Sequence, residues 1–122
     1  MRLQESGEMY LESIYVLSKR LGAVRSVDIS EYMGYSKPSV SRAVSLLKNG
    51  GYIVMDEENL ITLTESGQEI ATKIYERHTL LSDLLIRLGV PEEIAAQDAC
   101  RMEHAISDES IEAIRRHVER YR

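Results

Sequence analysis

Three residues near the carboxyl terminus, Cys100, Glu103 and His104, place a thiol, a carboxylate and an imidazole three and four positions apart. Side chains at these spacings share one face of a helix, so the three groups can converge on one point. Sulfur, oxygen and nitrogen donors together suit a transition metal. The spacing equally allows a buried cysteine beside a solvated Glu–His pair, so it does not choose between the two interpretations.

A thioether and a carboxylate repeat the spacing near the amino terminus, at Met9 and Glu12. Without context, such a methionine most often fills a core and such a glutamate is most often solvated. His78 stands in a long apolar-periodic stretch, where a lone histidine is usually structural or exposed. His117 lies among arginines and is expected on an exposed face.

The elements that must position these residues are mostly helices. Apolar residues three or four apart predict a first helix over about 7–20, which carries Met9 and Glu12 and ends at Gly22. A short second helix is expected to begin after Ser26 as its cap and to stop at Gly34. Ser36 caps a third helix that runs to residues 50–51, with a proline in its first turn. Two short helices around a glycine-containing turn are typical of a helix-turn-helix.

Two β-favouring runs follow, 52–55 and 60–63, separated by the acidic segment 56–59. They predict a hairpin, which makes the helix-turn-helix motif a winged one. The acidic tip is expected to stay clear of DNA, because phosphates would repel it.

The third helix provides the candidate DNA contacts. Residues 36–51 contain three basic side chains and no acidic one, although the whole chain carries a net charge of −5. Val40, Val44 and Leu47 are expected to face the core. The residues expected to contact phosphates and base edges are Ser36, Lys37, Ser39, Ser41, Arg42 and Lys48.

The second half predicts three more helices. A long helix over about 65–88 carries His78 and is stopped at residues 89–91. A further helix from 91 to about 106 carries the Cys100 group, and Ser107 caps a last helix that ends near residue 120.

Composition bounds the remaining possibilities. The chain has 122 residues, 43% of them apolar, and contains no apolar run long enough to cross a membrane. No secretory signal is visible at the amino terminus, so we expect a cytoplasmic protein. The single cysteine excludes an intramolecular disulfide.

Four segments, residues 8–15, 63–67, 98–104 and 106–109, closely resemble the diphtheria toxin repressor family of metal-dependent transcription regulators. The resemblance extends over nearly the whole chain and includes the helix order and the wing. It implies a regulatory metal site at Met9, Cys100, Glu103 and His104, and a metal-binding role for His78.

The ligand pattern resembles both branches of that family. Glu12 aligns with a carboxylate ligand of the shorter, manganese-sensing members, whereas Met9 and Cys100 look like the iron branch. Ser82 and Ala96 stand where iron-branch members often place a carboxylate and an imidazole, and we expect no SH3-like domain of the kind that this branch contains. Soft sulfur ligands favour Fe²⁺, with Mn²⁺ as the alternative.

The sequence therefore predicts a mainly α protein with a winged helix-turn-helix DNA-binding domain over residues 1–64. Residues 65–122 are expected to form a linker helix and a metal-binding and dimerisation domain. The expected function is a homodimeric repressor, not an enzyme, that binds operator DNA when loaded with metal and controls metal uptake genes. An ion held by ligands from both halves would restrain the two recognition helices and so switch DNA binding.

Two other functions are compatible with the same residues. A metal-independent winged-helix regulator would respond to a small ligand or a protein. A hydrolytic metalloenzyme would use Glu103 or Glu12 as a base beside an open metal position.

Overall fold

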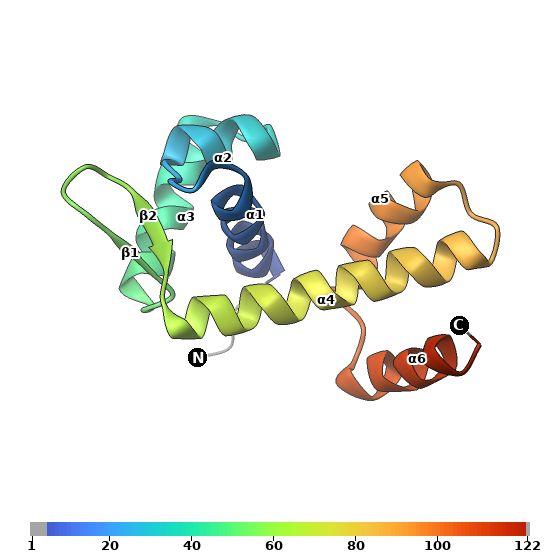
Figure 1. The fold of residues 1–122 in the computed structure, drawn as a ribbon. Coiled ribbons are helices and arrows are strands. Elements are labelled where there is room, and N and C mark those ends of the chain that lie inside the picture. Colours follow the sequence, from blue (N-terminus) through green and yellow to red (C-terminus); the bar gives the residue numbers. More distant parts are fainter. Residues whose placement is uncertain (1–4, 122) are drawn as a thin grey trace. The chain divides into compact units, whose positions relative to one another are not determined.

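A computed structural model describes residues 5–121 and contains six helices and one small hairpin within that range (Figure 1). Its contacts divide the chain into two compact units, with the division between Thr72 and Lys73. The division falls inside a helix, whereas the functional boundary at residue 64 stays a prediction. The mainly α architecture with an amino-terminal winged motif is confirmed.

The first unit contains a three-helix core and the wing. Its elements are α1 (Glu5–Leu21), α2 (Ser26–Met33), α3 (Lys37–Asn49), β1 (Ile53–Met55) and β2 (Ile61–Leu63), followed by the start of α4. The two strands are antiparallel, with Ile53 opposite Leu63, and Val24 adds an isolated bridge to Ile61. Apolar side chains from every one of these helices and from the hairpin form one buried cluster.

The caps of the short helices follow the sequence signals with one exception. Gly34 ends α2 in the left-handed conformation, and the Ser36 hydroxyl accepts the Ser39 N–H at the start of α3. The expectation that Ser26 caps α2 is wrong, since Ser26 is the first helical residue. The carboxylate of Asp28 accepts the Arg25 N–H at 2.9 Å instead, so the helix begins one residue earlier.

A long helix, α4 (Glu65–Arg87), starts in the first unit against the hairpin. The Thr64 hydroxyl accepts the Gly67 N–H and donates to the carbonyl of Gly51, which anchors the start of this helix. A Cβ at Gly67 would lie 2.1 Å from the Tyr52 carbonyl oxygen. Only glycine therefore lets α4 approach the hairpin so closely.

The second unit consists of the rest of α4 together with α5 (Glu92–Met102) and α6 (Asp108–Arg120). Helices α5 and α6 flank α4 (Figure 1), and Leu81, Ala99 and Ile111 contribute one buried residue from each helix to a small core. This unit positions His78 on α4 beside the segment that follows α5.

Candidate metal centre and nucleic-acid interface

The carboxylate of Glu103 is the centre of a polar cluster in the second unit. Its side chain is fully buried, at 0% exposed. Nδ1 of His78 lies 2.9 Å from Oε2, and Nε2 of His104 lies 3.3 Å from Oε1. Each carboxylate oxygen therefore has an imidazole nitrogen beside it, from α4 on one side and from the neighbouring residue on the other.

The backbone around Glu103 differs from the expected helix. The prediction that this helix continues to about residue 106 is wrong, because α5 ends at Met102. The buried guanidinium of Arg77 donates to the carbonyls of Glu103 and Ile106 at 3.1 and 2.7 Å. These two oxygens therefore accept a side-chain donor from α4 instead of a helical backbone N–H. Glu103 still has helical dihedrals as the cap residue, so its side chain follows the direction of the last turn.

Cys100 lies on the last turn of α5 and is half-buried. The fourth candidate donor of the second unit thus comes from the helix that leads directly into Glu103 and His104. The imidazoles of His78 and His104 therefore both lie within 3.3 Å of the Glu103 carboxylate.

Met9 and Glu12 belong to the first unit, where they stand one turn apart on α1. Both are half-buried, so neither is a fully packed core residue nor a fully solvated one. Their assignment as ligands stays a prediction.

The chemistry of the donors in the second unit fits a divalent transition metal. Burying a carboxylate is costly unless a charge or hydrogen bond compensates it. One carboxylate oxygen and two imidazole nitrogens are a donor set that manganese, iron and zinc all accept. The implied ion therefore fits the residues that are present.

Helix α3 carries the side of the first unit that is predicted to face DNA. Val40, Val44 and Leu47 are buried, which confirms their place in the core. All the side chains predicted to contact DNA are exposed: Ser36, Lys37, Ser39, Ser41, Arg42 and Lys48. Exposure makes these residues accessible, while their contacts with DNA stay a prediction.

A pocket next to α3 contains residues that the sequence analysis missed. Ser41 and Lys48 line it together with residues from the start of α2 and from the hairpin. The newly found lining residues are Arg25, Ser26, Ser45 and Asn59. Arg25 adds a cation next to α3, but it precedes α2 in the chain, so only the packing of α2 on α3 reveals it.

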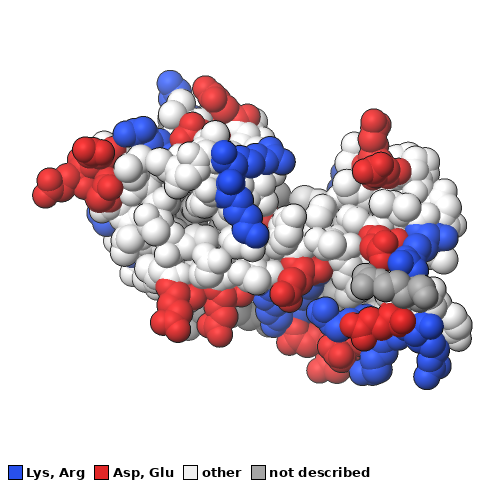
Figure 2. All heavy atoms as spheres, viewed as in Figure 1, with Lys and Arg blue, Asp and Glu red and all other residues white. Residues whose placement is uncertain are grey.

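Acidic side chains gather at the tip of the hairpin (Figure 2). One of them is already engaged within the turn, since the carboxylate of Asp56 accepts the N–H groups of Glu58 and Leu60, both at 2.9 Å. The acidic tip therefore has a local structural role, and its distance from DNA stays a prediction.

Two family models match the chain in the order that the fold shows. Residues 2–59 match the iron dependent repressor N-terminal DNA binding domain, and residues 64–122 match the iron dependent repressor metal binding and dimerisation domain. The Escherichia coli O6:H1 transcriptional regulator MntR is 37% identical over 106 residues, which cover 87% of this chain and 68% of the relative. The chain belongs to the diphtheria toxin repressor family of metal-dependent transcription regulators.

Two further comparisons support this family membership. An uncharacterised helix-turn-helix regulator of Methanocaldococcus jannaschii is 31% identical and is matched over 98% of both chains. The structure of the manganese regulator SloR superimposes with a TM-score of 0.83 at 29% identity, over 98% of this chain and 55% of that one. The chain thus spans about half the length of that solved relative.

Members of the family are transcription regulators rather than enzymes. Among the helices of residues 5–121, none is long and apolar enough to cross a bilayer.

Proposed function

We propose that this family member is a cytoplasmic repressor that binds operator DNA as a homodimer when a divalent metal is bound, and that it controls metal uptake genes. The observation that carries the metal dependence is the buried Glu103 carboxylate between the imidazoles of His78 and His104. The matched metal-binding family model supports the same assignment.

The proposed ligands come from both halves of the chain. Glu103, His78 and His104 form the core of the set, and Cys100 is added on the preceding turn of α5. Met9 and Glu12 complete the set on the basis of the family resemblance and their shared face of α1. A bound divalent cation would supply positive charge that balances the two carboxylates of this set. Because ligands are drawn from the DNA-binding and the metal-binding halves, metal binding and DNA binding are thermodynamically linked.

We propose Mn²⁺ as the first candidate metal and Fe²⁺ as the second. The sulfur donors Met9 and Cys100 favour Fe²⁺, which is the expectation from sequence. The Glu103 carboxylate and the two imidazoles that lie within 3.3 Å of it, at His78 and His104, also suit Mn²⁺. Two of the similar solved structures are the manganese regulator SloR and a manganese-dependent transcriptional repressor in complex with manganese.

For DNA, we propose that the exposed face of α3 enters the major groove and that Arg25 and Lys48 contact phosphates at its side. Both line the pocket beside α3. Because residues 36–51 of each subunit contain only three basic side chains, strong binding depends on two subunits acting together.

The proposed homodimer uses apolar surface of the second unit. Leu88, directly after α4, and Ile94, in the first turn of α5, are 71% and 49% exposed. Large apolar side chains this accessible near one turn favour an interface. The matched model for residues 64–122 is itself described as a dimerisation domain.

The test is a metal titration of DNA binding. Duplexes are selected from a random-sequence pool in the presence of MnCl₂, labelled, and titrated with the full chain by fluorescence anisotropy under MnCl₂, anaerobic FeCl₂, or EDTA. We expect binding with either metal and its loss with EDTA. Glu103→Gln, which keeps the shape but removes the charge, should bind no tighter with metal than with EDTA.

His117→Ala is the matched control, because this histidine is exposed on α6 and packs on Tyr121. It should retain the parental metal response. Equal DNA affinity of the parent with MnCl₂, FeCl₂ and EDTA would contradict the proposal and favour a metal-independent regulator.

A further inference from the structure

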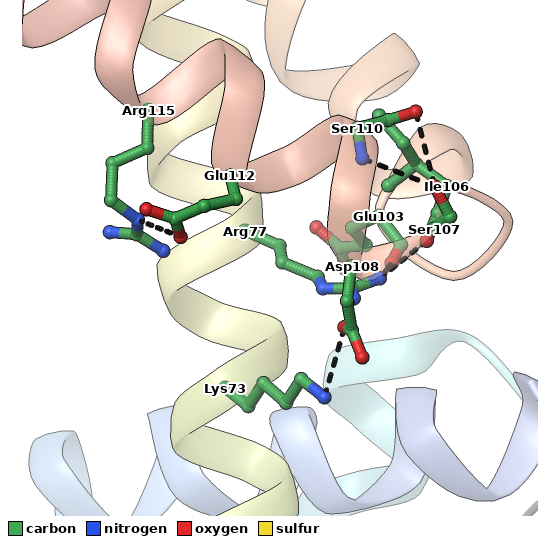
Figure 3. A network of polar contacts seen from close by, with 9 residues as sticks. All are labelled: Lys73, Arg77, Glu103, Ile106, Ser107, Asp108, Ser110, Glu112 and Arg115. Carbon is green, nitrogen blue, oxygen red and sulfur yellow. Dashed lines mark hydrogen bonds and ion pairs between the residues drawn. The ribbon is translucent and has the colours of Figure 1, made fainter.

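The guanidinium of Arg77 connects α4 to the segment between α5 and α6 (Figure 3). The side chain is buried, at 7% exposed, and comes from the helical position directly before His78. Its Nη1 donates to the carbonyls of Glu103 and Ile106, and its Nη2 pairs with the carboxylate of Asp108. One side chain therefore holds both ends of the segment 103–108.

The contact with the Glu103 carbonyl satisfies a group that the end of α5 leaves open, because Glu103 is the cap residue of that helix. The last carbonyls of a helix have no intrahelical partner, and they form the negative end of its dipole. Arg77 supplies both the donors and the positive charge from a different helix. Burying that charge requires good partners, and two carbonyls together with a carboxylate provide them.

The geometry required here is specific to arginine. A guanidinium is a rigid planar fork whose nitrogens can reach several acceptors at once. An ammonium group at the same position keeps the charge but is a point donor on a flexible stem, so it cannot reproduce the fork. Arg77→Lys therefore separates the loss of geometry from the loss of charge.

We propose that Arg77 is a positioning residue for the metal site, and this inference rests on the proposed function. Arg77 and His78 are consecutive, as are Glu103 and His104, so the bond from Arg77 to the Glu103 carbonyl sets the separation of α4 and α5 ligands. The site is held in its binding geometry before an ion arrives. Through Asp108, the first residue of α6, the same side chain ties the position of that helix to the ligands.

Lys73 is a natural control for this role. It lies one turn before Arg77 on α4, and its Nζ is 3.1 Å from the same Asp108 oxygen. Its ion pair with Asp108 is exposed on both sides, so it contributes little to any rigid geometry. Lys73→Met should change metal affinity by no more than a few-fold.

The experiment measures Mn²⁺ affinity of the full chain by the loss of the free-ion electron paramagnetic resonance signal. We expect Arg77→Lys to lower the affinity about 10- to 100-fold, the range found when groups supporting ligands are removed. The signal of the bound ion should also change shape, which a loss of general stability alone would not produce. Circular dichroism and sedimentation of the metal-free variant should match the parent.

Asp108→Asn keeps the inference testable if Arg77→Lys does not fold. Its side chain is exposed, and the change removes the negative charge that pairs with Nη2 while leaving both carbonyl contacts, so we expect a smaller loss of affinity. Parental affinity and bound-ion signal in Arg77→Lys, or in Asp108→Asn if only that variant folds, would overturn the positioning role while leaving the proposed function intact. A parent chain that binds no Mn²⁺ and shows no metal-stimulated DNA binding would overturn the proposed function, and the inference with it.

Discussion

At the scale of single residues, the carboxylate of Asp108 makes the stability of the second unit depend on pH in the acid range. A hydrogen bond and the charge of Lys73, followed by the charge of Arg77, hold the pKa of Asp108 below its usual value of 3.8. A carboxyl whose pKa is lower in the folded state stabilises the fold above its unfolded pKa. That stabilisation is lost as the pH falls through the lowered, folded pKa.

We therefore predict that Asp108→Asn flattens the acid limb of the stability curve below about pH 4. The measurement is urea unfolding of the metal-free chain at a series of pH values. Glu109→Gln is the matched control, because it removes an adjacent exposed charge from the same helix start. An acid limb that is equally steep in the parent and in Asp108→Asn would show that this carboxylate does not carry the effect.

The choice of metal is a second question at the residue scale. Met9→Asp replaces a thioether by a hard oxygen one turn from Glu12 on α1. We expect the ratio of Mn²⁺-stimulated to Fe²⁺-stimulated DNA affinity to rise, because Mn²⁺ prefers carboxylates. Anisotropy at matched free metal under anaerobic conditions measures this ratio.

An unchanged ratio would mean that Met9 is not a ligand or that ligand softness does not select the metal. Met33→Asp is an unsuitable control because Met33 packs on the core of the first unit. Met1 lies outside the described residues. Glu8→Asp, on the same helix and half-buried, provides the control for a nearby carboxylate change.

At the scale of elements, the contact between α4 and the hairpin depends on the absence of one side chain. A Cβ at Gly67 would be 2.1 Å from the carbonyl oxygen of Tyr52, and that carbonyl also accepts the Thr64 N–H. Alanine would gain about 1 kcal/mol in helix propensity. The backbone must move to relieve the clash, so we predict that Gly67→Ala lowers the free energy of unfolding by about 1–3 kcal/mol in total.

Urea unfolding followed by circular dichroism measures this change. Ser66→Ala is the matched control, because Ser66 is the exposed neighbour on the same turn and should stay close to the parent. A Gly67→Ala chain more stable than the parent would show that α4 does not need this close approach.

At the scale of the whole molecule, dimerisation decides whether two recognition helices can act together. We predict that Leu88→Glu weakens the homodimer at least about tenfold, because an unpaired charge would be desolvated in the interface. Leu88 is exposed within its own chain, so the fold of the subunit should be unaffected. Analytical ultracentrifugation over a concentration series measures the equilibrium.

Leu46→Glu is the control, since Leu46 is a similarly exposed leucine on α3 of the first unit. It should leave the dimer intact. A parent chain that sediments as a monomer at all concentrations, or a Leu88→Glu variant with the parental dimerisation constant, would contradict the proposed interface. Ile111 and Val118 of α6, in contrast, are buried within the subunit.

Most of the elements could be predicted from sequence because their signals are local. Apolar periodicity, Gly34 and the Ser36 and Ser107 caps depend on neighbours a few residues away, and they locate five helices with small errors at their ends. The same local patterns identify the winged motif and the buried face of α3. The candidate ligands are found by residue type and spacing, together with the family resemblance.

The tertiary structure alone decided where α5 ends and what surrounds Glu103. The periodicity of the sequence continues to about residue 106. In the structure, Arg77, which is 26 residues earlier in the chain, donates a hydrogen bond to the Glu103 carbonyl. A contact between residues so far apart has no local signature, because it depends on the packing of α4 against α5. The same reason explains Arg25, whose place beside α3 follows from the packing of two helices, and Gly67, whose need for glycine comes from a backbone oxygen of the hairpin.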